Sequence, residues 1–167
     1  LRRWWEVATD QISFVRTRNR ERSERWVPHK KGGPFRKWAG NEEYILDWGS
    51  EGEAIHRYHD VPLSTNGAPM RGKAYFFQPS LAWSRISTSD FSLRSHGPGL
   101  AYDSTAPSIF GEEGVRSVLL GLLNSVVVRH LLGALSPTLD FRIAALSNIP
   151  LPSGWREIDP STVKELE

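Results

Sequence analysis

Apolar residues recur at helical spacing in one long segment, between Glu112 and Gly133. The positions that repeat are Val115, Val118, Leu119, Leu122, Leu123, Val126, Val127, His130 and Leu131. Steps of three and four residues place such side chains on one face of a helix. Glu112 and Glu113 precede this face and Arg129 lies near its end, as the helix dipole favours. The pattern predicts one long core helix near the C-terminus.

Shorter apolar runs, punctuated by glycine, proline and serine, predict several strands. In the run Phe91–Ser95, Phe91, Leu93 and Ser95 alternate with Ser92, Arg94 and His96, which is typical of a half-buried strand. The segment from Trp4 to Arg16 is apolar but shows no clear period, so it stays open between helix and strand. We expect strands at 43–48, 73–77, 81–87 and 91–95, and a short helix at 51–58.

Strands mixed with a few unevenly placed helices favour an α+β fold over a doubly wound sheet. We expect a small mixed or antiparallel sheet with the long buried helix near the C-terminus. Pro150 and Pro152 mark a boundary, which predicts one domain over residues 1–152 and a tail, or the start of a following segment, over residues 153–167.

The composition of the 167 residues suits one globular domain and excludes several kinds of chemistry. With no cysteine, the chain has no disulfide, thiol nucleophile or zinc–thiolate site. The longest apolar stretch is interrupted by Gly121, Asn124 and Ser125, and it falls short of the ~20 residues that cross a bilayer. We therefore expect a cytoplasmic protein with no membrane partner, and the start at Leu1 suggests an excerpt from a longer chain.

The net charge of +2 hides an uneven distribution. Residues 1–37 hold eleven basic and four acidic side chains, whereas the remaining residues hold ten and fifteen. Between Trp26 and Trp38, four cations surround Gly32 and Gly33, and glycines of this kind allow the close backbone approach and positive φ of a phosphate-cradling loop. For the arginine-rich stretch at 16–25, a solvated charged face is an equally good interpretation. Clustered cations are typical of proteins that bind polyanions.

No catalytic or metal site emerges from the motifs. Glu53, His56 and His59 would share one face of a helix, but a solvated acidic helix explains them better than a metal site. The chain has no phosphate-binding or dinucleotide-binding glycine loop and no Gly-x-Ser-x-Gly elbow. We therefore predict no catalytic residue and no metal ligand.

Arginines and hydroxyl side chains gather on the predicted strands at 81–95 and in their turn. Arginine and serine are the usual groups that contact base edges in a DNA major groove. The alternative is an ordinary exposed sheet face. The candidates for base contacts are Arg85, Ser87, Ser89 and Arg94.

The segment Arg25–Tyr44, RWVPHKKGGPFRKWAGNEEY, resembles the W-V-P-x-x-K-G-G-x-F-R-K-W-x-G-N motif of adenine-specific DNA methyltransferases of the bacteriophage-exclusion (BREX) type and their restriction-modification relatives. Further stretches are similar to that family in the same order: AWSRIS with FSLR, LLNSVV, SPTLDF and SNIP. The sequence departs from the family pattern at Ala82, Ser136 and Asp140.

The resemblance implies the target-recognition region in the C-terminal part of such an enzyme. The family's S-adenosylmethionine loop and its Asn/Asp-Pro-Pro-Tyr/Phe motif for the flipped adenine are both absent from this sequence. We expect no cofactor in this chain, S-adenosylmethionine in the parent enzyme, and as partners double-stranded DNA and an N-terminal methyltransferase domain of the same polypeptide. Whether the fragment is itself an enzyme stays open.

The resemblance also suggests a division of labour. Lys30, Lys31, Arg36 and Lys37 would contact DNA phosphates, and Arg85, Ser87, Ser89 and Arg94 would read base edges, with Trp38 and Trp83 supporting the loops. One alternative is a single-strand DNA or RNA-binding module that uses tryptophan stacking and the basic arm. Another is a protein-interaction domain whose basic arm docks an acidic partner.

Overall fold

The computed structural model of the chain describes residues 1–14, 25–65, 68 and 71–161. The arginines at positions 16, 18, 20 and 22 lie outside the described residues. Within the chain, two compact units are built from alternating segments. Unit 1 takes in Leu1–Lys31, Glu42–Pro79 and Gly97–Asp103, and unit 2 takes in Gly32–Asn41, Ser80–His96 and Ser104–Glu167. The predicted boundary at residue 152 stays a prediction.

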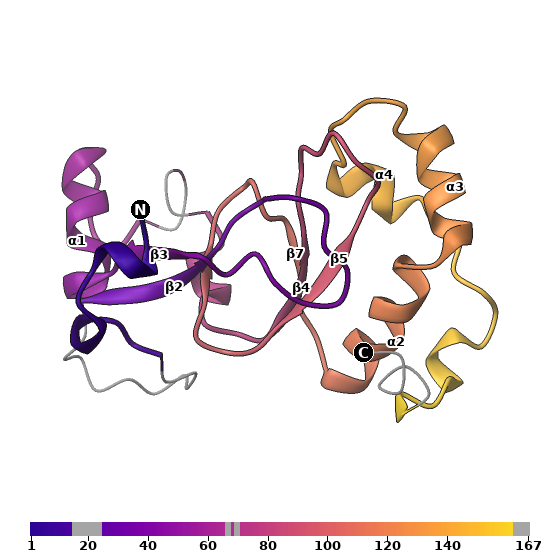
Figure 1. Cartoon of the computed structure of the whole chain (residues 1–167), viewed down its shortest axis with the longest axis horizontal. Helices are drawn as coiled ribbons and strands as arrows, with labels where there is room; N and C mark the ends of the chain where they lie inside the picture. Colours follow the sequence, from indigo (N-terminus) through magenta and orange to yellow (C-terminus); the bar gives the residue numbers. More distant parts are fainter. Residues whose placement is uncertain (15–24, 66–67, 69–70, 162–167) are drawn as a thin grey trace. The chain divides into compact units, whose positions relative to one another are not determined.

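Unit 1 is built on a four-stranded mixed sheet in the order β1-β3-β2-β6, of which Figure 1 labels β2 and β3. The strands are β1 (Arg2–Arg3), β2 (Trp26–Lys30), β3 (Tyr44–Asp47) and β6 (Ala101–Tyr102). β1 and β2 run antiparallel to β3, and β6 runs parallel to β2. Helix α1 (Gly49–Tyr58) follows β3, and 3₁₀ helices occupy Trp4–Glu6, Thr9–Gln11 and Lys73–Tyr75. The interior contains two clusters, Val27 with Phe76 and Ala101, and Ile12 with Trp26 and Ile45.

Unit 2 is built on a three-stranded antiparallel sheet in the order β5-β4-β7, and α2 packs against β4 and β5 (Figure 1). Its strands are β4 (Ser80–Trp83), β5 (Leu93–His96) and β7 (Ser108–Ile109). Its helices are α2 (Glu113–Leu123), α3 (Val126–Leu135), α4 (Ile143–Ser147) and a 3₁₀ helix at Trp155–Glu157. Trp83, Leu93, Leu120, Leu132 and Phe141 belong to its core.

The α+β class with mixed sheets is confirmed, and so is the strand β3. The predicted helix is confirmed as α1, except that Glu51 and Gly52 at its start have positive φ. The strand predicted at 73–77 is wrong. Gly72 has a left-handed conformation, with φ of 78°, and Lys73–Tyr75 forms a 3₁₀ helix after it. The half-buried alternation predicted for 91–95 is also wrong, because within β5 only Ser95 is exposed while Arg94 and His96 are buried.

The long helix predicted near the C-terminus is two helices, α2 and α3, which meet at a bend of 73°. Ser125 has extended backbone angles and accepts a hydrogen bond from the Val128 amide at 3.3 Å, so it caps the start of α3. None of the helices in the described ranges is by itself long and apolar enough to cross a membrane; α2 and α3 reach such a length only as the bent pair.

Candidate functional site

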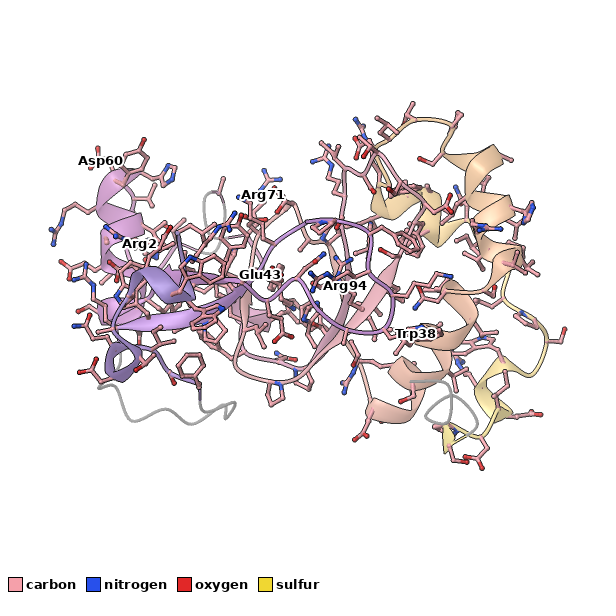
Figure 2. All side chains as sticks on the ribbon, viewed as in Figure 1. Arg2, Trp38, Glu43, Asp60, Arg71 and Arg94 are labelled. Carbon is pink, nitrogen blue, oxygen red and sulfur yellow. The ribbon has the colours of Figure 1, made fainter. Side chains whose placement is uncertain are left out.

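The loop of residues 32–41, in unit 2, covers the outer edge of β5. The Trp38 amide donates to the Leu93 carbonyl at 3.0 Å, and the Ser95 amide donates to the Trp38 carbonyl at 2.7 Å. Figure 2 labels Trp38 and Arg94, the pair that forms this short parallel bridge. The cations of the loop are therefore carried by a segment that is fixed to the sheet.

Gly32 and Gly33 contact neighbouring segments of unit 2 through their backbone amides. The Gly32 amide donates to the Thr105 hydroxyl at 3.3 Å, and the Gly33 amide donates to the Ser84 hydroxyl at 2.9 Å. A Cβ on Gly32 would lie 2.7 Å from the Thr105 carbonyl oxygen, so Gly32 allows its backbone to pack closely against Thr105, while the expected approach to a phosphate stays a prediction. The expected positive φ is wrong for both glycines. Their amides thus contact protein hydroxyls in the position where a phosphate cradle was expected.

The four predicted phosphate contacts divide between the units. Lys30 and Lys31 belong to unit 1, and Arg36 and Lys37 belong to unit 2. Lys31 is half-buried with its Nζ 4.8 Å from the centre of the Tyr44 ring, and Arg36 is exposed. Their contact with DNA stays a prediction.

The side chains of Lys30 and Lys37 both contact other residues of the protein. The Lys30 side chain is buried with its Nζ 4.8 Å from the centre of the Tyr102 ring. Burial lowers the pKa of Lys30 to about 7, although the charge of Glu42 opposes this shift. Lys37 donates to the Asn124 carbonyl at 2.7 Å, at the C-terminal end of α2, where a cation suits the helix dipole.

Among the predicted base contacts, Arg94 is buried in unit 2. Its Nη1 donates to the Arg36 carbonyl at 3.4 Å and to the Ser92 hydroxyl at 3.3 Å, and its Nη2 donates to the Ser84 hydroxyl at 3.2 Å. These bonds tie β5 to the end of β4 and to the loop of residues 32–41. The geometry gives Arg94 a supporting position, and its role in base contacts stays a prediction.

Arg85, Ser87 and Ser89 lie in the turn between β4 and β5, which is joined by backbone hydrogen bonds to the segment of residues 136–142. The Phe141 amide donates to the Arg85 carbonyl at 2.7 Å, and the Ser87 amide donates to the Leu139 carbonyl at 3.0 Å. We call these two segments, residues 84–89 and 136–142, the paired turns. Ile86 is 68% exposed at their bridge, and Ser89 is exposed as well. Hydroxyl and arginine side chains are thus presented from a fixed backbone.

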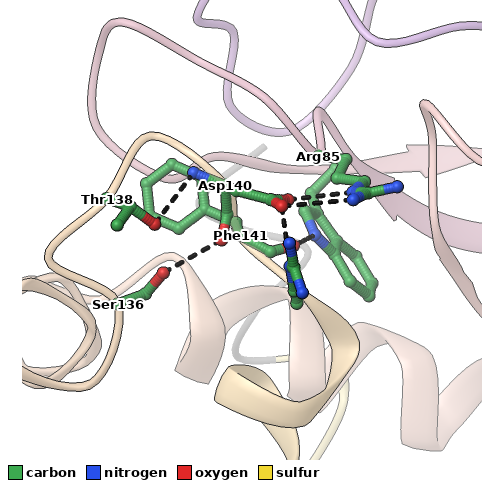
Figure 3. A network of polar contacts seen from close by, with 7 residues as sticks. Arg85, Ser136, Thr138, Asp140 and Phe141 are labelled. Atoms are coloured by element: carbon green, nitrogen blue, oxygen red, sulfur yellow. Dashed lines mark hydrogen bonds and ion pairs between the residues drawn. The ribbon is translucent and has the colours of Figure 1, made fainter.

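Asp140 accepts hydrogen bonds from two arginines, and those from Arg85 join the paired turns (Figure 3). The Arg85 Nε and Nη2 donate to its Oδ1 and Oδ2 at 2.9 and 3.1 Å, and the Arg142 Nε donates to its Oδ2 at 2.7 Å. Hydrogen bonds from Arg85 and then Arg142 lower the pKa of Asp140 to about 2. The carboxylate is therefore ionised at neutral pH. Arg85 is among the site residues predicted from the sequence, whereas Arg142 is not.

The possible metal ligands of α1 have different surroundings. His56 is buried, His59 is exposed, and Glu53 pairs with Arg57. In the described residues, no group of three histidine, aspartate or glutamate side chains is arranged to hold a metal ion.

Two methyltransferases are similar to the chain over 90% of its length. It is 37% identical over 153 residues to the adenine-specific methyltransferase PglX of Lacticaseibacillus casei (strain Zhang) and 30% identical over 154 residues to the adenine-specific methyltransferase BrxX of Escherichia coli O9:H4 (strain HS). The chain spans only 13% and 12% of the lengths of these relatives. No family model matches it. The resemblance to adenine-specific methyltransferases is thus confirmed.

Proposed function

We propose that this chain is the part of an adenine-specific DNA methyltransferase that reads the sequence of double-stranded DNA. The observation that carries the proposal is its similarity, over 90% of its own length, to 12–13% of two such enzymes. The sequence has no Asn-Pro-Pro-Tyr motif. Methyl transfer from S-adenosylmethionine to the target adenine would be the work of another domain of the parent, within a restriction-modification or phage-defence system.

The paired turns supply the groups for base contacts. Arg85 can bind a guanine through two hydrogen bonds, and the Ser87 and Ser89 hydroxyls can donate or accept. Lys31 and Arg36 would contact phosphates, which give affinity without base preference. The contacts that read bases and the contacts that bind phosphates are then made by different residues.

This division predicts two different defects. A pool of random duplexes would be sequenced before and after binding to the chain, and the selected sequence would then be titrated against a scrambled one. Arg85→Ala should remove the preference at one base pair, a loss of about 1–3 kcal/mol, whereas Lys31→Ala should weaken all duplexes alike and reduce the salt slope by about one.

Arg57→Ala is the matched control, because Arg57 is exposed and pairs with Glu53, four residues away on the same helix. It should change neither quantity. Equal effects of Arg85→Ala and Lys31→Ala on selected and scrambled duplexes would refute the assignment of roles. Failure of the wild-type chain to bind duplex at low salt would refute the proposed function itself.

A second candidate function rests on the exposed tryptophans of unit 1. Trp4 and Trp5 are 43% and 52% exposed, and the Arg3 guanidinium lies 5.1 Å from the centre of the Trp5 ring. Exposed aromatic rings beside cations can stack on unpaired bases. Competition between duplex and single-stranded oligonucleotides of one sequence separates the two functions, since stacking would favour the single strand.

A further inference from the structure

In unit 2, the Asp140 carboxylate accepts hydrogen bonds from two arginines. Arg85 and Arg142 both donate to Asp140, and their side chains are 39% and 70% exposed while that of Asp140 is 22% exposed. A single negative charge leaves this group of three with one excess positive charge. Such a group differs from the Arg25–Asp47 pair of unit 1, in which one arginine faces one carboxylate.

The backbone around Asp140 is fixed on several sides. The Trp83 indole N–H donates to the Phe141 carbonyl at 2.7 Å inside the core, and the Ser136 hydroxyl donates to the Asp140 carbonyl at 3.0 Å. With the backbone bonds of the paired turns, these contacts fix the carboxylate relative to the Cα of Arg85. Asp140 therefore selects one orientation of the Arg85 guanidinium from the many that a long side chain has.

In that orientation, the Nη1–Nη2 end of the Arg85 guanidinium faces away from Asp140 and can bind a ligand. Asp140 takes the Nε–Nη2 side of Arg85. A guanidinium has a second pair of parallel N–H donors at its Nη1–Nη2 end, and this spacing matches the O6 and N7 acceptors of guanine. Arg142 donates to the carboxylate through its Nε, and its guanidinium has the same pair of parallel N–H donors at the Nη1–Nη2 end.

We propose that Arg85, Asp140 and Arg142 form a guanine-reading group, in which Asp140 is a positioning residue and Arg142 is a second cation that contacts the same duplex. The proposal rests on the proposed function and deepens it, because it names the base class that the paired turns recognise. An arginine that is oriented before binding loses less conformational entropy on contact, which sharpens discrimination between bases.

Unit 2 contains a second arginine–aspartate pair that provides matched controls. Arg129 and Asp90 are 49% and 55% exposed and meet through one contact at 3.5 Å. Asp140→Asn and Asp90→Asn change the charge equally, as do Arg142→Gln and Arg129→Gln. Each variant of the chain would first be checked for folding by circular dichroism and thermal unfolding, and then used in the random-duplex selection.

Asp140→Asn should lower the preference for guanine over the other bases at one selected position by about tenfold, while its affinity for scrambled duplex should not fall. Asp90→Asn should leave the selected sequence unchanged. Arg142→Gln should weaken binding of the selected duplex more than Arg129→Gln does, and this comparison holds even where Asp140→Asn fails to fold.

Two outcomes would overturn the inference. The first is a guanine preference that Asp140→Asn leaves intact, and the second is equal binding by Arg142→Gln and Arg129→Gln. In both cases the proposed function would survive. If the first outcome comes with a uniform loss of affinity for all duplexes, it would indicate phosphate as the ligand. A wild-type chain that selects no duplex sequence would refute the proposed function as well.

Discussion

Two buried cations show that a positive charge in the sequence does not by itself mark a binding surface. Arg94 is buried, and its guanidinium donates to a carbonyl and two hydroxyls. Lys30 is buried with its ammonium group over the Tyr102 ring. Arginine stays charged in such a place because its pKa is so high, whereas burial can bring lysine close to neutrality. Arg94 of unit 2 is thus a buried arginine held by hydrogen bonds, whereas Lys30 of unit 1 is a buried lysine with a lowered pKa.

The lowered pKa of Lys30 predicts how its contribution to stability varies with pH. In the folded chain the pKa is about 7, whereas an unfolded lysine keeps its ordinary value of 10.5. Between these values the unfolded state binds the extra proton, so a rise in pH should stabilise the folded state, at a rate of at most about 1.4 kcal/mol per pH unit. Below pH 7 both states are protonated and the curve should level off.

Urea unfolding of the wild type and of Lys30→Met between pH 6 and 10 would measure this difference, because methionine fills similar space without titrating. The wild type should gain stability relative to the variant as the pH rises above about 7. Parallel curves would mean that the buried lysine keeps its proton, and that its charge remains available at neutral pH.

At the break between α2 and α3, the Asn124 side chain connects the helices of unit 2 to its sheet. At the end of α2, the buried Asn124 side chain accepts from the Leu93 amide at 2.9 Å and donates to the Leu93 carbonyl at 2.9 Å. The amide group thus replaces a neighbouring strand along part of the β5 edge, where unpaired backbone groups would otherwise be costly. Ser125 then begins α3. The LLNS stretch of the sequence, residues 122–125, thus forms this junction.

Asn124→Ala should therefore destabilise the chain. The Leu93 amide would lose its acceptor inside the core, while its carbonyl would keep the Trp38 amide as a donor. One buried backbone N–H without a partner costs about 1–3 kcal/mol. Urea unfolding would measure the loss, with Asn148→Ala as the control, since Asn148 is exposed and its replacement should change stability by less than about 0.5 kcal/mol. Equal stability of the two variants would contradict the strand-like role of Asn124.

Hydrophobic periodicity could predict that α2 and α3 are helical but could not predict the break between them. Apolar residues continue through the junction, but the positions predicted for the buried face, Val126, Val127 and His130, are exposed in α3, where Val128 and Leu132 are buried instead. What ends α2 is a hydrogen bond between Asn124 and a strand about thirty residues earlier in the sequence. Contacts of this range leave no periodic signal.

At the scale of the whole molecule, the fold class and the kind of relative could be predicted from the sequence, whereas the assembled site could not. Arg85 was selected by its residue type and neighbours, but Asp140 was noted only as a departure from a family pattern and Arg142 not at all. The three meet because Phe141 and Arg85, more than fifty residues apart, share a backbone hydrogen bond. The division of the four predicted phosphate contacts between two units was equally hidden, because these residues are close in sequence.

The uneven charge of the chain predicts that position, and not only total charge, governs its affinity for DNA. Residues 1–37 hold eleven of the 21 basic side chains, and Arg2, Arg3 and Arg36 are exposed among them. Replacing these three by glutamine should reduce the slope of log affinity against log salt by up to about 3, since each released phosphate contact contributes about 0.9. The base preference should not change, because phosphate contacts carry no sequence information.

The matched control is a second triple variant with glutamine at Arg57, Arg129 and Arg156, which are also exposed. Both variants change the net charge from +2 to −1. Titration of one duplex at several salt concentrations should therefore separate local contacts from the overall field of the molecule. If the two triple variants lose the same slope, total charge alone drives the association, and the basic residues near the N-terminus have no special position on DNA. If only the first loses it, those residues contact the duplex backbone.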